Sequence, residues 1–195
     1  MKPSPHDAAF RRYIEKGLAE LQKSDTPEAR RTLRALTSGQ VKVDGFSDLT
    51  AADFRHVRKD LPAERLTKLD ARAVKRISKA LNGYQWDDRI YVHRDLSPRR
   101  LASLLVHEVT HVLTRAEENY RGPKAALLQE YAAFYAEKRF QGVEMTAARC
   151  LALKKYVIEL YELKGVTPAD VPDRPTPPLA ARPAPSASRA SRASR

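Results

Sequence analysis

Two histidines and a glutamate within five residues are the clearest chemical signal in the chain. The segment His107-Glu108-Val109-Thr110-His111 places two imidazoles four residues apart, and such positions share one face of an α-helix. The pair can therefore present two nitrogen ligands to one metal ion. Glu108 is rotated by about 100° from His107, which keeps it off the metal but near a metal-bound water. The pattern indicates a helical zinc site with a general base beside it.

A catalytic zinc site takes three protein ligands and leaves the fourth position to water, so a third ligand is needed. The chain lacks the glycine and histidine of the metzincin continuation, which excludes that pattern. A carboxylate on a following helix remains, and Glu130 and Glu137 are the candidates there. Glu117 and Glu118 are weaker candidates, because they follow His111 too closely for the chain to return comfortably.

The segment from His107 to Glu130 resembles the gluzincin zinc metallopeptidases, in which H-E-x-x-H is followed by eighteen residues and a glutamate. The run EYAAFYAE also resembles the second-helix motif of small metallopeptidase domains of the anthrax lethal-factor and phage-antirepressor types. The resemblance covers about residues 89–140. It implies that His107, His111 and Glu130 bind a single zinc ion. It further implies that Glu108 is the general base and that the core is zincin-like. Gluzincins often have another stabilising His or Tyr downstream, and no histidine follows His111.

Helical spacing places Glu130 on a mostly apolar face together with Leu127 and Phe134. A carboxylate in such a place is costly unless it binds a cation or another partner. Glu137, two turns further on the same face, has two interpretations. It orients a zinc-bound histidine, or it is a surface carboxylate paired with the basic residues that follow it. The sequence favours the surface pairing.

Other polar residues near the motif are expected to have structural roles. His93 is expected to be a solvated strand histidine, because the motif already supplies the usual histidine pair. Aromatic residues at helical spacing mostly pack in cores, so packing is expected for three tyrosines that could otherwise stabilise an oxyanion: Tyr120, Tyr131 and Tyr135. Solvation is expected for two arginines that could otherwise bind a substrate carboxylate: Arg115 and Arg121.

The single cysteine, Cys150, lies among apolar helical positions and is expected to be a small buried residue rather than a nucleophile. One cysteine also excludes an internal disulfide framework and fits a reducing compartment. Trp86 and Tyr84 stand near basic residues, an arrangement that can bind nucleic acid. No nucleic-acid-binding motif supports that role, so structural aromatics before a strand are the better interpretation.

The chain has 36 Lys and Arg against 24 Asp and Glu in 195 residues, a net charge of +12. This balance favours acidic protein segments, nucleic acid or anionic surfaces as partners, and it equally fits a basic solvated surface. No apolar run approaches the roughly 18 residues of a membrane helix, so no membrane span is expected. The N-terminus lacks the apolar region of a Sec-type signal peptide, which predicts a cytoplasmic protein or export by another route.

The elements that position these residues give a mainly helical α+β fold, with a minimal zincin-like core, a short β-sheet and a helical N-terminal part. Periodicity and capping signals predict helices over 6–23, 27–37, 51–60, 66–81, 98–115, 123–140 and 146–164, and strands over 40–46 and 89–93. The second strand is expected at a sheet edge, where a substrate backbone could pair with it. Its Ile90 and Val92 are expected to face the core, with Tyr91 on the other side.

We expect three parts: a helical part over 1–83, the metallopeptidase core over 84–166, and a disordered basic tail rich in Pro, Ala, Ser and Arg over 167–195. The predicted function is a zinc metallopeptidase, an endopeptidase that acts on a protein or peptide substrate. The alternative is a basic binding, regulatory or effector protein with a vestigial or structural metal site. The intact Glu108 argues against the alternative, because a structural site needs no base.

Overall fold

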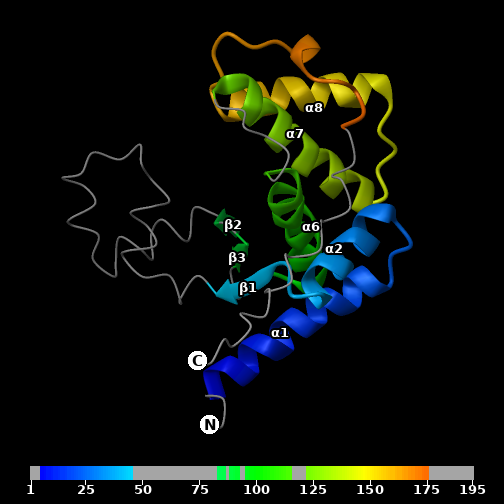
Figure 1. Cartoon of the computed structure of the whole chain (residues 1–195). Coiled ribbons are helices and arrows are strands. Elements are labelled where there is room, and N and C mark those ends of the chain that lie inside the picture. The colour runs from blue at the N-terminus through cyan, green and yellow to red at the C-terminus, as the bar shows by residue number, and fades with distance from the viewer. Residues whose placement is uncertain (1–4, 46–82, 87, 93–94, 116–121, 176–195) are drawn as a thin grey trace, which may run out of the picture.

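The computed structural model of the chain describes residues 5–45, 83–86, 88–92, 95–115 and 122–175, and it is mainly helical with one small sheet (Figure 1). The described helices are, in chain order, α1 (Pro5–Gln22), α2 (Pro27–Thr37), α6 (Pro98–Arg115), α7 (Pro123–Phe140), α8 (Ala147–Leu160) and the short 3₁₀ helix η2 (Pro168–Asp170). Helix α6 is central: α1, α2, α7 and two strands of the sheet all contact it. The fold is therefore organised around the helix that contains the two histidines. The helices expected over 51–60 and 66–81 lie outside the described residues.

Three helices begin at the residues that their capping signals indicate. The hydroxyls of Thr26 and Thr146 accept hydrogen bonds from the backbone N–H three residues later, at 3.3 and 3.4 Å, where α2 and α8 begin. Ser97 accepts the equivalent bond at 3.4 Å where α6 begins. Each cap satisfies a backbone donor that the first helical turn leaves unpaired. The predicted starts of these helices are confirmed.

The sheet contains three described strands in the order β1 (Lys42–Gly45), β3 (Arg89–Val92), β2 (Gly83–Trp86). Strand β3 pairs parallel with β1 and antiparallel with β2. Two expectations for β3 are wrong. The first is its position, since it is the central strand of the described sheet rather than an edge strand, and the second is the exposure that an outward side chain implies, since Tyr91 is only 6% exposed. Ile90 and Val92 belong to the main core and Tyr91 does not, in agreement with the expected facing. Strand β2 was not expected, since its four residues show no clear alternation.

Two glycines in neighbouring elements allow those elements to pack closely against helix α6. A Cβ atom added at Gly17 of α1 would lie 2.7 Å from the Leu101 side chain, and one at Gly83 of β2 would lie 2.7 Å from Leu104. Both glycines therefore allow closer approach than any other residue would. The main core forms around α6 and includes Leu21, Val41, Ile90, Val92, Leu101, Leu105, Val106 and Val109. A second core lies between α7, α8 and the segment after α8; it includes Leu127, Tyr131, Cys150, Val157 and Val171.

The C-terminal end of the described chain differs from expectation. Helix α8 ends at Leu160 rather than at Lys164, and Glu162 and Gly165 then take positive φ angles of 49° and 75°, which turn the chain. Residues 167–175, which we call the strap, run back over α7 and α8 (Figure 1). The predicted disorder from Thr167 onward is wrong for the strap.

Three hydrogen bonds from two side chains, together with one buried apolar side chain, hold the strap. The hydroxyl of Tyr131 donates to the backbone oxygen of Asp173 at 2.6 Å, and Val171 is buried against α8. The ammonium of Lys154 is almost fully buried and lies 2.7 Å from both the Val171 carbonyl and the Asp173 carboxylate. The composition of this segment does not reveal that it is ordered, because the order depends on one apolar side chain and on hydrogen bonds from two side chains elsewhere in the fold. None of the described helices is long and apolar enough to cross a membrane.

Candidate metal centre

The structure brings together the three side chains that the sequence proposed as ligands. The Nε2 atoms of His107 and His111 on α6 are 3.2 Å apart. The Oε2 atom of Glu130 on α7 lies 3.8 Å from the first and 3.6 Å from the second. Tetrahedral geometry with ligand bonds of about 2.0–2.1 Å places neighbouring ligand atoms about 3.3 Å apart. The three atoms therefore form a triangle close to the size that one zinc ion spans.

Glu130 supplies an atom that lacks a partner within the described chain. Its Oε2 is buried and accepts no hydrogen bond there, although a buried carboxylate oxygen is costly to leave unsatisfied. Burial acts to raise the pKa of Glu130, but its interactions with His111, Tyr161 and His107 outweigh burial, so the pKa is lowered. Oε2 of Glu130 thus keeps a lone pair free for a cation. The group of His107, His111 and Glu130 fits a metal ion.

Glu108 lies beside this group and is almost fully buried. Burial raises the pKa of its carboxyl group, and the charges of Glu130 and Glu137 add to that effect, while the two imidazoles oppose it. Three carboxylates thus surround two histidines in a space with little access to water. A divalent cation would neutralise much of this concentrated negative charge.

Glu137 does not behave as a surface carboxylate, and that expectation is wrong. Its Oε2 lies 3.3 Å from Nδ1 of His107, the ring nitrogen that faces away from the ligand triangle. Its Oε1 accepts hydrogen bonds from the Ser103 hydroxyl at 3.2 Å and from the Gln141 amide at 2.9 Å. The Gln141 amide also lies 2.7 Å from the Ser103 hydroxyl. Glu137 is thus held in place and orients His107, with a proton on Nδ1 and the lone pair of Nε2 directed at the metal position.

Aromatic rings from α7 and α8 complete the surroundings of the site. The Phe134 ring lies edge-on to His107 at a centroid distance of 4.6 Å, and Tyr156 packs on Phe134 at 5.7 Å. The phenol of Tyr161 lies beside the Glu130 carboxylate and helps to lower the pKa of that carboxyl group. Burial and the negative charge of Glu130 raise the pKa of Tyr161 far above its usual value, so its hydroxyl stays protonated and can donate a hydrogen bond.

Sequence reasoning missed three of these residues. Ser103 precedes His107 by four residues and Gln141 follows Glu137 by four, so helical i,i+4 spacing could have drawn attention to both. Tyr161 has no such signal. It follows the end of α8 and reaches Glu130 only because α8 packs on α7.

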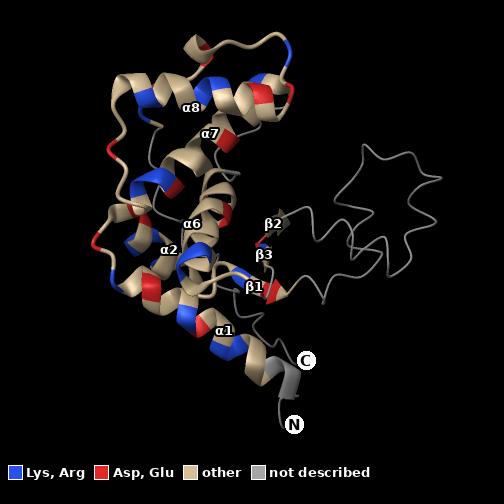
Figure 2. Ribbon diagram, turned by 180° about the vertical axis from the view of Figure 1, so that it is seen from behind, with Lys and Arg blue, Asp and Glu red and all other residues tan. Residues whose placement is uncertain are grey.

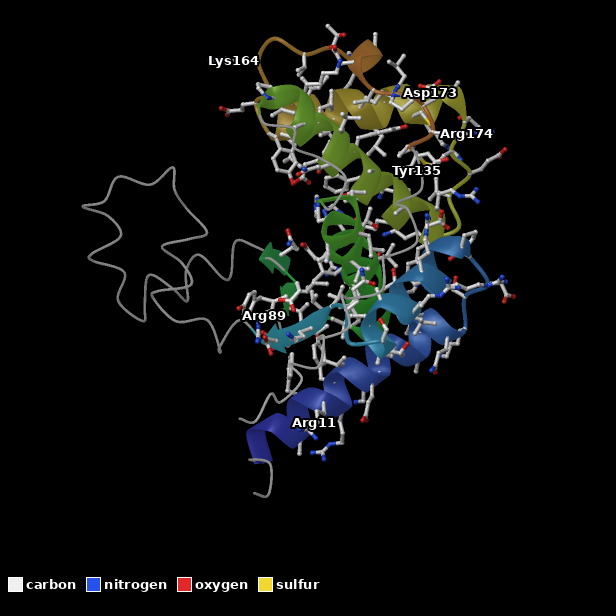
Figure 3. The ribbon with its side chains drawn as sticks, viewed as in Figure 1. Arg11, Arg89, Tyr135, Lys164, Asp173 and Arg174 are labelled. Carbon is white, nitrogen blue, oxygen red and sulfur yellow. The ribbon has the colours of Figure 1, made fainter. Side chains whose placement is uncertain are left out.

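The remaining candidates have the structural roles expected where they are described. Tyr131 and Cys150 are buried in the second core, as predicted. Tyr135 points away from the metal ligands, toward the strap (Figure 3). The other candidate residues either lie outside the described part of the chain or have an undescribed side chain. They are His93, Glu117, Glu118, Tyr120, Arg121, Arg115, Tyr84 and Trp86.

No model of a protein family, no curated protein and no solved structure matches the chain. The assignment of a metal centre accordingly depends on the positions and burial of its own side chains. Those positions bring two imidazole nitrogens and one carboxylate oxygen to a common point, with a further buried carboxylate beside them.

Proposed function

We propose that the protein is a zinc-dependent metallopeptidase with His107, His111 and Glu130 as the zinc ligands. The observation that carries the proposal is the convergence of three ligand atoms, one of which is a buried carboxylate oxygen without another partner in the described chain. Two nitrogens and one oxygen form the ligand set of many catalytic zinc sites, which leave a position open for water. Carboxylates and imidazoles also bind other divalent metals, but the tetrahedral spacing favours zinc.

Glu108 is the general base in this proposal. A zinc ion bound at the site would supply Lewis acidity, which lowers the pKa of a bound water and polarises a substrate carbonyl. Glu108 would accept a proton from the attacking water as the water oxygen forms a bond to the carbonyl carbon. It would return the proton to the leaving nitrogen as the carbon–nitrogen bond breaks, so one peptide bond and one water give a carboxylic acid and an amine.

The other residues of the site have positioning roles. Glu137, fixed by Ser103 and Gln141, holds the ring of His107 and keeps Nε2 free of a proton. Tyr161 lies beside Glu130 and restricts the rotation of that carboxylate. Such support narrows the range of ligand positions, and precise placement is a large part of catalytic efficiency.

The fold interpretation that accompanies this proposal is a minimal zincin-like core of the gluzincin type. Its support is the order of elements: a strand, then α6 with the two histidines, then α7 with the glutamate. Since β3 is the central strand of the described sheet, a substrate backbone would have to pair with β1 or β2, the outer strands of that sheet. The substrate is proposed to be a protein or peptide.

Metal removal and restoration test the proposal directly. The full chain is stripped with a chelator, supplied with one equivalent of zinc, and assayed for cleavage of unfolded casein by mass spectrometry. We expect cleavage with zinc and none after stripping, and the His111→Ala variant should stay inactive with zinc. Tight binding of one zinc ion without cleavage of casein or of a mixed peptide library would contradict the peptidase assignment. Failure to bind zinc would contradict the metal centre itself.

A further inference from the structure

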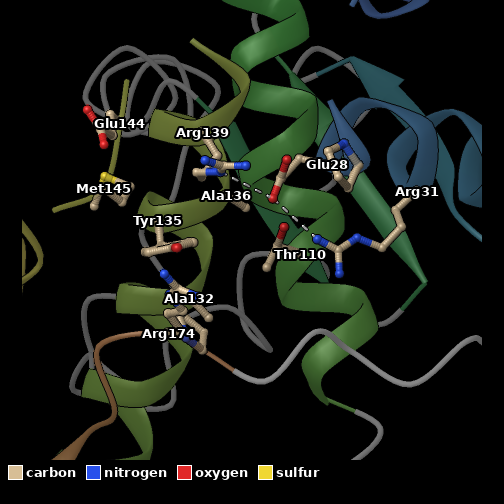
Figure 4. A pocket seen from close by; sticks show the side chains of 12 residues that line it. Glu28, Arg31, Thr110, Ala132, Tyr135, Ala136, Arg139, Glu144, Met145 and Arg174 are labelled. Atoms are coloured by element: carbon tan, nitrogen blue, oxygen red, sulfur yellow. Dashed lines mark ion pairs between the residues drawn. The ribbon is translucent and has the colours of Figure 1, made fainter. Parts of the chain in front are cut away.

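A pocket of about 720 Å³ lies between α2, α6, α7 and the strap, away from the metal centre (Figure 4). This volume is within the range of about 300–1,000 Å³ that is typical of ligand sites. Its charged lining consists of Glu28, Arg31, Arg139, Glu144 and Arg174, and its uncharged lining includes Pro27, Thr110, Ala132, Tyr135, Ala136, Met145 and Pro175. The lining thus combines arginines with short apolar surfaces.

The pocket and the metal centre use opposite faces of α7. Ala132, Tyr135, Ala136 and Arg139 line the pocket. At 100° per residue their positions centre about 180° around the helix from the face that contains Glu130. A ligand in the pocket would therefore contact α7 from behind the metal ligands. The pocket is a separate site and not an extension of the metal centre.

The arginines leave positive charge available in the pocket. Arg31 lies 3.6 Å and Arg139 lies 4.0 Å from the same oxygen of Glu28 (Figure 4). Two guanidinium groups therefore share one carboxylate in two long ion pairs. Arg174 forms no ion pair with a described residue. Guanidinium groups bind carboxylates through paired hydrogen bonds. Three arginines against the two carboxylates of Glu28 and Glu144 leave the charged lining with a net charge of +1, so positive charge remains for an anionic group of a ligand.

Glu28 is a nearly buried carboxylate in the wall of the pocket. Its side chain is 8% exposed, and its Oε2 atom is buried without a hydrogen-bond partner in the described chain. The Glu28 residue lines the pocket. An unsatisfied buried oxygen of this kind costs about 1–3 kcal/mol, and more when it is charged. This oxygen is shielded from the pocket as well as from water, so the charges that a ligand meets are those of the arginines and of Glu144.

The wall that carries Arg174 is held firmly. The preceding residue, Asp173, is tied to α8 through the buried Lys154 and to α7 through the Tyr131 hydroxyl. Asp173 and Arg174 lie side by side next to α8 in Figure 3. Arg174 is thus presented to the pocket by an ordered segment.

We propose that this pocket binds an acidic peptide segment of a partner or substrate protein. The side-chain carboxylates of the segment bind Arg139 and Arg174. Its apolar atoms lie over Met145 and the prolines of the pocket rim. This inference does not depend on the proposed peptidase activity, because the pocket contains none of the metal ligands.

The combination of groups favours a peptide over an inorganic anion. A phosphate ion would satisfy the arginines but would leave the apolar lining uncovered. A peptide presents carboxylates, N–H donors and carbon atoms together. Basic positions are distributed over α1, α2 and α8 (Figure 2), and the net charge of +12 would further attract an acidic segment.

Fluorescence anisotropy of a defined probe tests the proposal with the full chain. The probe is a fluorescein-labelled hexapeptide of alternating alanine and glutamate, and the matched probe has glutamine in place of glutamate. We expect saturable binding of the acidic probe, with the glutamine probe bound at least tenfold more weakly. The Arg174→Gln and Arg139→Gln variants should each weaken binding of the acidic probe roughly tenfold, the usual effect of one charge-assisted contact.

The control variant is Arg11→Gln, which removes the same charge from an exposed position of α1 at the far end of the molecule (Figure 3). It should bind the acidic probe within twofold of the unchanged protein. Equal weakening by Arg11→Gln and Arg174→Gln would show nonspecific attraction and overturn the proposal. Displacement of the probe by inorganic phosphate at concentrations comparable to the peptide would overturn the peptide assignment in favour of a simple anion site. Thermal unfolding of each variant confirms that a loss of binding reflects the pocket.

Discussion

The carboxylate of Glu137 lies 3.3 Å from Nδ1 of His107, and the opposite nitrogen of the same ring lies 3.8 Å from Glu130. One imidazole thus stands between a carboxylate that orients it and a carboxylate that shares its proposed metal ion. Hydrogen bonding of this kind fixes the tautomer of a ligating histidine and strengthens its donor nitrogen. The relationship makes Glu137 part of the metal centre although it supplies no ligand atom.

Replacing Glu137 by glutamine should weaken zinc binding by roughly 10- to 100-fold, since such partners typically contribute that much to affinity. Zinc affinity is measured by competition with a chromophoric chelator. The matched control is Glu159→Gln, a change of the same kind at an exposed position of α8. Unchanged affinity in the Glu137 variant would show that the contact with His107 has no role in metal binding.

Replacing Tyr161 by phenylalanine should weaken zinc binding roughly tenfold, because it removes the hydroxyl that lies beside the Glu130 carboxylate and restrains it. Tyr156→Phe is the control, since it removes a phenol hydroxyl from a ring that packs on Phe134 beside the same site. The zinc affinities of the two variants should differ clearly in the same competition with a chelator. If they bind zinc equally well, the phenol of Tyr161 does not support the ligand.

Replacing Tyr131 by phenylalanine should lower the free energy of unfolding by about 1 kcal/mol, because the Asp173 carbonyl loses its hydrogen bond and the strap loosens. Urea unfolding followed by circular dichroism measures this change. Tyr135→Phe removes a hydroxyl that has no hydrogen bond to a described residue, and its effect should be smaller. A larger loss in the control would mean that the strap is held mainly by its apolar contacts.

Replacing Gly17 by valine should lower the free energy of unfolding by about 1–3 kcal/mol, since the new side chain would collide with the buried Leu101 of α6. Ala9→Val, at an exposed position of the same helix, controls for the change in helix propensity. The measurement is again urea unfolding. Equal effects at the two positions would show that α1 can shift away from α6 without cost.

The sequence was most informative where a local signal coincides with a helix. Thr26, Ser97 and Thr146 mark helix starts that the structure confirms, because caps act within one turn. Helical spacing also predicted that His107 and His111 lie on one face, because the spacing of residues on a helix determines which side chains are neighbours. The placement of Glu130 came from the resemblance to gluzincins.

Features that depend on tertiary packing were not predictable. Glu137 looked like a surface residue because basic neighbours follow it in the chain, whereas its actual partners come from α6 and from the end of its own helix. Tyr161 reaches Glu130 only through the packing of α8 on α7. The strap was missed because Val171 is its single buried apolar residue, and its polar ties involve residues far apart in sequence.

The central claim is that Glu108 acts as a base beside a zinc ion held by three other side chains. The measurement that tests it most directly combines zinc content and casein cleavage for the unchanged protein and for Glu108→Gln, which keeps the size of the side chain but cannot accept the proton. The account predicts one zinc ion per chain in both proteins, with cleavage lost by at least two orders of magnitude in the variant, a typical contribution of a general base. Equal cleavage by the two zinc-loaded proteins would contradict it.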